Sequence, residues 1–167
     1  LVQYARRGAR FIRLDAIGFL WKQLGTTCMH LPQTHEAIKL SRKILELYAP
    51  GTVIITETNV PHQDHISYFG NGFDDAHLLY QFPLPPLVMF SILKGNASHL
   101  TEWADGLELP SSETAFFNFL SSHDGIGVRP VEGILAPEEI QFLVDSALHS
   151  GGEVSYKNNG DGTRSPY

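Results

Sequence analysis

The sequence predicts an α/β fold built on a parallel sheet. Short β-branched segments alternate with amphipathic helical segments, and the order along the chain is strand then helix, repeated three times. Such an order places consecutive strands in parallel, with right-handed crossovers between them. The composition, 43% hydrophobic and 18% charged, suits a globular chain with a real core. Repeats and linkers are absent, so residues 1–167 are interpreted as a single domain.

Two strands are predicted in the first half of the chain. Apolar Ile12 and Leu14 alternate with Arg13 and Asp15, which is the period of a β-strand. The run 52–57 is rich in β-branched residues, as in a strand buried on both faces of a parallel sheet. A long polar loop is expected to follow it over 58–75.

A helix is predicted between these strands, with Thr34 as its N-cap and Pro50-Gly51 as its stop. The residues expected on its buried face are Ile38, Ser41, Leu45 and Tyr48.

The second half contains two further strand segments and two helices. The run 77–85 is a weak strand candidate and 86–106 a helix with a soft start, while 114–125 is a strand that continues into a loop. A helix over 136–152 has Pro137 in its first turn, Glu138 and Glu139 at its positive N-terminal end, and Gly151 as its stop. The tail, 155–167, is predicted to be a loop.

Charge and composition exclude several classes of protein. The formal charge of −6, without a basic stripe, argues against a nucleic-acid partner. No apolar run is long enough to span a bilayer, so no membrane association is expected. The lone Cys28 cannot form an internal disulfide, which favours a cytoplasmic location. Because the chain begins at Leu1 rather than Met, we expect it to be a section of a longer polypeptide.

Three acidic residues stand at the ends of predicted strands. Asp15, Glu57 and Asp124 each lie at or just after the C-terminal end of a strand, and in a barrel these ends face one pocket. Strand alternation places Arg13 on the same side as Asp15, about 7 Å away, where it would keep that carboxylate ionised. Any one of the three could instead cap a helix or pair with a surface arginine. Three together, with Arg13 and His123 beside two of them, favour a catalytic site.

Three motifs containing these residues resemble the α-amylase superfamily of retaining glycoside hydrolases. IRLDAIGFLWK, IITETN and NFLSSHDGIGVRP are similar to its second, third and fourth conserved regions, in the family's order. The resemblance implies a partial (β/α)8 TIM barrel, roughly strands 4 to 7 with their helices, and without the first three strands and the eighth. It also implies that Asp15 is the nucleophile, Glu57 the general acid/base and Asp124 the stabiliser of the charged sugar. Arg13 and His123 would contact the nucleophile and the glucose hydroxyls.

The loops around these motifs resemble the sucrose phosphorylase subfamily, including its glucosylglycerate-phosphorylase-like members. This likeness implies α-glucosyl transfer through a covalent β-glucosyl-Asp intermediate, with inorganic phosphate as acceptor and a small carbohydrate as substrate. Hydrolysis of α-glucans or sucrose is one alternative, and a non-catalytic, self-associating fragment is another. One departure is His65, which stands where Asn is expected in the acid/base loop and bears on acceptor selectivity.

Further contacts and partners are expected around this site. Tyr68 and Phe69, shortly after Glu57, are candidates for stacking on a sugar, and Arg129, behind His123 and Asp124, is a candidate for recognising phosphate or the carboxylate of an acceptor. His62, Asp64 and His65 could form a metal site, but no fourth ligand is evident, so neither metal nor cofactor is expected. Four strands leave two unpaired sheet edges, so a homo-oligomer is expected.

Overall fold

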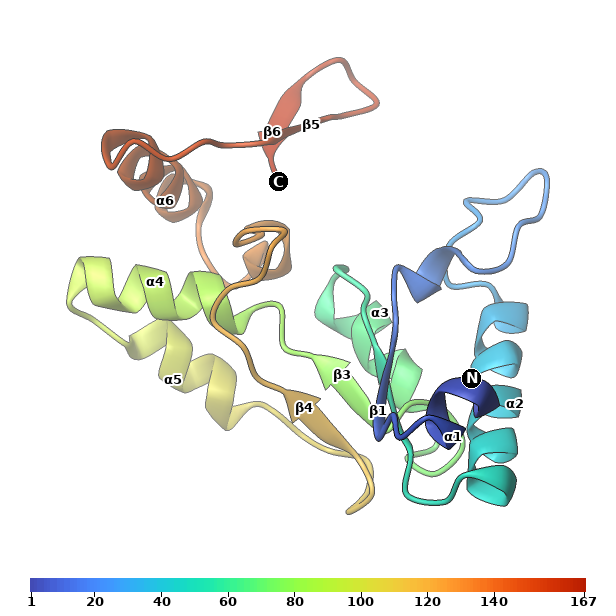
Figure 1. The fold of residues 1–167 in the computed structure, drawn as a ribbon. Helices are drawn as coiled ribbons and strands as arrows, with labels where there is room; N and C mark the ends of the chain where they lie inside the picture. Colours follow the sequence, from blue (N-terminus) through green and yellow to red (C-terminus); the bar gives the residue numbers. More distant parts are fainter. The chain divides into compact units, whose positions relative to one another are not determined.

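The computed structural model describes residues 1–167 and divides into two compact units. The first comprises residues 1–80 and 108–117, and the second comprises 81–107 and 118–167. Figure 1 shows the helices and strands of both units. The single-domain organisation of residues 1–167 stays a prediction. No helix in either unit combines the length and the apolar character that crossing a membrane requires.

The first unit is built on a four-stranded parallel sheet, which confirms the predicted α/β class. Its strands, β1 (Phe11–Leu14), β2 (Val53–Thr56), β3 (Leu78–Tyr80) and β4 (Ala115–Phe117), are hydrogen-bonded in chain order. The strands are shorter than the runs that predicted them. The register aligns Arg13 with Ile55, and Ile55 with Leu78. In such a sheet all C-terminal strand ends lie along one edge.

Helix α2 (Pro32–Tyr48) contributes Ile38 and Leu45 to the apolar cluster of this sheet. It begins at Pro32 rather than after a Thr34 cap, because proline at the first position is already set for the helical φ angle. The apolar cluster between helix, strands and the loop after β2 contains Ile12, Ile17, Ile38, Leu45, Ile54, Tyr68, Phe69, Ala76 and Leu79. The short helix α1 (Val2–Arg6) precedes β1.

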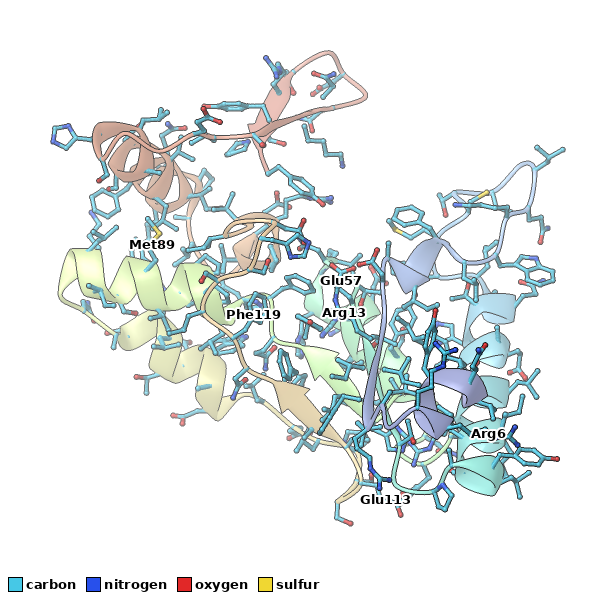
Figure 2. The ribbon with its side chains drawn as sticks, viewed as in Figure 1. Arg6, Arg13, Glu57, Met89, Glu113 and Phe119 are labelled. Atoms are coloured by element: carbon cyan, nitrogen blue, oxygen red, sulfur yellow. The ribbon has the colours of Figure 1, made fainter.

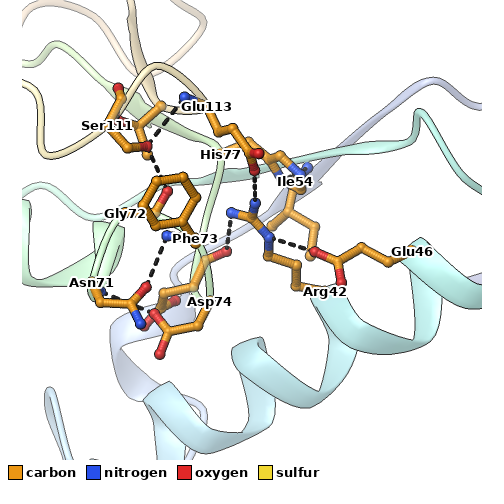
Figure 3. Close-up of polar contacts among 12 residues, drawn as sticks. Arg42, Glu46, Ile54, Asn71, Gly72, Phe73, Asp74, His77, Ser111 and Glu113 are labelled. Atoms are coloured by element: carbon orange, nitrogen blue, oxygen red, sulfur yellow. Dashed lines mark hydrogen bonds and ion pairs between the residues drawn. The ribbon is translucent and has the colours of Figure 1, made fainter.

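The predicted buried face of α2 was partly wrong. Ile38 and Leu45 are buried as expected, but Tyr48 is exposed and Arg42 is buried. Arg42 donates to the backbone carbonyl of Asp75 at 3.2 Å and pairs with Glu46 at 3.0 Å and Glu113 at 2.9 Å (Figure 3). A charged residue with this many partners can replace an apolar one inside a protein, which hydrophobic periodicity does not detect.

These contacts lie at the N-terminal ends of the strands. Glu113 precedes β4, and His77, which precedes β3, receives a hydrogen bond from the Ile54 amide at 3.2 Å (Figure 3). In parallel α/β folds this end of the sheet serves stability, whereas the opposite end carries the chemistry.

The segment after β2, expected to be a loop, contains two short helical elements. They are α3 (His62–Ile66) and the 3-10 helix η2 (Ser67–Phe69). A further 3-10 helix, η1 (Ile17–Phe19), follows β1.

The second unit consists of helices and a hairpin: α4 (Leu84–Lys94), α5 (Ser98–Asp105), η3 (Arg129–Val131), α6 (Pro137–His149), β5 (Tyr156–Asn158) and β6 (Arg164–Pro166). The single helix predicted over 86–106 is two helices, because Gly95 takes a left-handed conformation with φ 65° and ends α4. The α6 prediction is confirmed, with Pro137 first and Glu139 accepting the Ala136 amide. The tail predicted as a loop contains the antiparallel β5–β6 pair.

Candidate active site

Asp15 and Glu57 follow two neighbouring strands of the first unit. Asp15 comes directly after β1 and Glu57 directly after β2, and the parallel register aligns Leu14 with Thr56 just before them. The Glu57 amide continues the ladder by donating to the Leu14 carbonyl at 3.1 Å. The sheet therefore delivers both carboxylates to the same edge, where its C-terminal strand ends meet.

Arg13 lies between the two carboxylates. Its Nη1 atom is 2.5 Å from Asp15 Oδ1, and its Nη2 atom is 3.9 Å from Glu57 Oε2. Figure 2 shows Arg13 and Glu57 beside each other in the first unit. A single guanidinium thus lies near both carboxylates.

Tyr80 forms a platform for this guanidinium. The Arg13 Cζ atom lies 5.5 Å from the centre of the Tyr80 ring, which in turn contacts the Phe117 ring at 4.9 Å. An arginine over an aromatic face at this distance gains about 0.5–1 kcal/mol at a partly exposed position. Tyr80 was not predicted as a site residue. The register aligns Leu78 with Ile55 and Arg13, so these side chains lie on one face of the sheet. Tyr80 lies two residues after Leu78 and therefore on the same face, which the sequence alone does not reveal.

The backbone at Ala16 completes the contacts of Glu57. Ala16 has φ 45° and ψ 36°, a left-handed conformation that is uncommon outside glycine, and its N–H donates to Glu57 Oε2 at 2.8 Å. The two carboxyl groups differ in exposure: the Asp15 side chain is 72% exposed and that of Glu57 16%. An accessible carboxylate beside a partly desolvated one is the arrangement that a nucleophile and a general acid need.

His65 lies buried beneath this pair, on α3. Its Nδ1 atom is 3.0 Å from the hydroxyl oxygen of Thr58, the residue after Glu57. Burial lowers the pKa of His65 to about 4, and burial also lowers the pKa of His62. His62, Asp64 and His65 do not gather as ligands, and no group of three or more metal-binding side chains occurs in the structure.

The structure places Tyr68 and Phe69 in the core, which corrects the expectation that they stack on a sugar. Their exposed fractions are 0% and 1%, so neither ring has a face open to a ligand. The Tyr68 hydroxyl is 2.7 Å from His30 Nδ1, and the Phe69 ring meets Phe116 edge-on at 5.3 Å. Both residues hold the loop after β2 against the sheet.

His123, Asp124 and Arg129 belong to the second unit. His123 Nε2 is 3.3 Å from Asp124 Oδ2, and both side chains are exposed. The Asp124 amide donates to the Ser122 hydroxyl at 3.2 Å, and half-buried Arg129 begins η3. The convergence of Asp124 with Asp15 and Glu57 stays a prediction.

Comparison with known proteins identifies relatives of this chain, although no family model matches it. Over the whole of this chain it is 57% identical to glucosylglycerate phosphorylase of Escherichia coli K12. Over 97% of this chain it is 58% identical to glucosylglycerate phosphorylase of Allomeiothermus silvanus. It is 34% identical to trehalose synthase of Thermus thermophilus over 86% of its length. The chain spans about 30%, 29% and 14% of these three proteins.

The fold of this chain has a solved counterpart. The crystal structure of sucrose 6F-phosphate phosphorylase from Thermoanaerobacter thermosaccharolyticum matches with a TM-score of 0.80 at 23% identity, over 96% of this chain and 32% of that one. This likeness concerns the fold, which corresponds to part of a TIM barrel.

The relatives and the fold together assign the chain to the α-amylase superfamily, a family of enzymes, as the three motifs predicted. Within that superfamily, its relatives at more than half identity are glucosylglycerate phosphorylases, of which it spans less than a third.

Proposed function

We propose that this chain contributes two catalytic carboxylates to a retaining α-glucosyl-transferring phosphorylase. The observation that carries the proposal is the arrangement of Asp15 and Glu57 around Arg13, with the Ala16 amide on Glu57. The high identity to glucosylglycerate phosphorylases supports an α-glucosylglycerate-type donor and inorganic phosphate as acceptor.

In the proposed mechanism Asp15 attacks the anomeric carbon while Glu57 protonates the departing oxygen. The glycosidic C–O bond breaks, an Asp15–glucosyl ester forms, and the aglycone leaves with the proton from Glu57. An oxygen of hydrogen phosphate then attacks the same carbon from the opposite side and its proton passes to Glu57. The Asp15–glucosyl bond breaks, which frees the Asp15 carboxylate and yields α-glucose 1-phosphate. Two inversions at one carbon give net retention.

The remaining predicted residues belong to this proposal through their motifs. Asp124 would stabilise the positive charge on the sugar, His123 would contact its hydroxyls, and Arg129 would recognise phosphate or the carboxylate of an acceptor. The chain would supply strands 4 to 7 of a catalytic barrel, and the protein would work in the cytoplasm as a self-associating assembly.

The test separates phosphorolysis from hydrolysis by product. With an α-glucosylglycerate donor and phosphate, the polypeptide carrying this chain should release glucose 1-phosphate, whereas a hydrolase would release free glucose in either the presence or absence of phosphate. Asp15→Asn should lower transfer by about 10⁴-fold or more, because an amide is not a competent nucleophile and no neighbour replaces it. Transfer at near wild-type rates by Asp15→Asn would refute the assignment.

A second candidate is a non-catalytic fragment that associates with itself. It is favoured by the open edges of β1 and β4 and by Phe11, which is 63% exposed on β1. The same assay distinguishes it, since such a fragment would bind copies of itself and release neither product.

A further inference from the structure

We propose that His65 is a positioning residue that sets the placement of the Glu57 carboxylate relative to Arg13. The inference deepens the proposed function, because it assigns a residue that tunes the acid/base step. It rests on the position of His65 between the ends of β2 and β3.

On one side His65 holds the residue that follows Glu57. The Thr58 side chain is buried, and its hydroxyl oxygen lies 3.0 Å from His65 Nδ1. Two hydrogen bonds therefore hold the backbone around Glu57: its own amide donates to the Leu14 carbonyl, and the side chain of the next residue, Thr58, pairs with His65. The carboxylate then meets the Ala16 amide at 2.8 Å.

On the other side His65 contacts the end of β3. The His65 ring interacts with the backbone of Tyr80, and the Arg13 guanidinium lies over the ring of the same Tyr80. His65 therefore connects the strand end that supplies Glu57 to the residue that supports Arg13, the cation shared by Glu57 and Asp15.

The chemistry of a buried neutral imidazole suits this connection. One ring nitrogen of a neutral imidazole accepts a hydrogen bond while the other donates one, so the His65 ring can meet the Thr58 hydroxyl at Nδ1 and still present a second polar atom to the end of β3. An Asn at this position would have a shorter side chain, and its amide would reach only the place of Nδ1. His65 adds the link toward Tyr80.

Three variants separate the two links. His65→Asn keeps a polar group near Nδ1, His65→Gln keeps one near Nε2, and His65→Leu removes both. His77→Asn is the matched control, because His77 is a partly buried histidine of the same sheet whose Nδ1 accepts the Ile54 amide at the opposite end of the strands.

The first measurement is amide hydrogen exchange in this chain, which requires no activity. His65→Leu should accelerate exchange at Ala16 by about tenfold or more, since a hydrogen bond to a carboxylate is lost or lengthened. His65→Gln should have nearly the same effect, and His65→Asn a smaller one. Exchange at Ile54 and Ile55 should keep its wild-type rate in these three variants. Unchanged exchange at Ala16 in His65→Leu, or equal acceleration at all three amides, would overturn the proposal.

The second measurement uses the leaving group and tests the role in transfer. His65→Leu should lower kcat for an O-linked α-glucosyl donor about tenfold more than for α-glucosyl fluoride, whose leaving group needs little protonation, while KM changes little. His77→Asn should affect both donors alike. Equal losses for both donors in His65→Leu would contradict a role in acid catalysis. These rates are measured on the longer polypeptide that carries this chain. If that polypeptide transferred no glucose at all, the proposed function would fail, while the exchange result would still decide the placement of Glu57.

Discussion

Replacing His65 should change how the stability of the first unit depends on pH. The folded protein holds this imidazole neutral because burial lowers its pKa from 6.5 to about 4. Between these two values the unfolded chain binds a proton that the folded chain does not, so stability falls as the pH falls. One pKa unit corresponds to about 1.4 kcal/mol. The contribution of neutral His65 to the free energy of unfolding, which is complete above pH 6.5, is therefore smaller by about 2 kcal/mol at pH 5 and by about 3 kcal/mol at pH 4.

The assay compares wild type with His65→Asn in urea at pH 7, 6 and 5, followed by the NMR amide signals of β2. The wild-type free energy of unfolding should fall more steeply with decreasing pH, and the difference between the two proteins should change by about 2 kcal/mol over this range. The pKa values of His30, His62 and His77 are also lowered by burial, but these residues are present in both proteins. The exposed His149 provides the control His149→Asn, which should follow the wild-type profile. Parallel profiles for wild type and His65→Asn, or an NMR titration of His65 near 6.5, would refute the reasoning.

Three further predictions concern the pair, the sheet and its edges. Glu57→Gln should lose most transfer from O-linked donors but recover with α-glucosyl fluoride, measured as initial rates; equal losses would remove Glu57 from the acid role. Arg42→Met should destabilise the first unit by about 2–4 kcal/mol in urea unfolding, because the Asp75 carbonyl loses its buried donor, while Ala16 exchange stays unchanged. Light scattering of the isolated chain should give a mass of at least twice 18.6 kDa, because the edges of β1 and β4 are unpaired. A mass of 18.6 kDa, that of one chain, would contradict association.

The sequence predicted the elements whose signals are local. The alternation around Ile12 and the β-branched run before Glu57 located β1 and β2, and Pro137 with its acidic neighbours located α6. The two carboxylates at strand ends followed from the same patterns together with the motifs.

The details that the sequence did not reveal depend on tertiary contacts. Arg42 is buried because partners from distant segments, Asp75 and Glu113, satisfy its guanidinium. Tyr68 follows Glu57 closely, which suggested that its ring stacks on a sugar, but the ring is buried and its hydroxyl pairs with His30 inside the core. Ala16 gives no sign in sequence of a left-handed backbone, because its conformation is determined by the turn that follows β1.

The contacts described for the Asp15–Glu57 pair come from residues of the first unit. They involve the β1–β2 register, the Tyr80 platform under Arg13, the Ala16 amide and the support of His65, and all of them lie within residues 1–80. Asp124, His123 and Arg129 lie in the other unit. If the proposed function holds, the nucleophile and acid/base can therefore be arranged correctly in a chain that is still inactive. The step that limits catalysis would then be the assembly of the second unit and the rest of the barrel around this pair, rather than the folding of the pair itself. The isolated chain should therefore show normal protection of the Ala16 amide against hydrogen exchange while transferring no glucose.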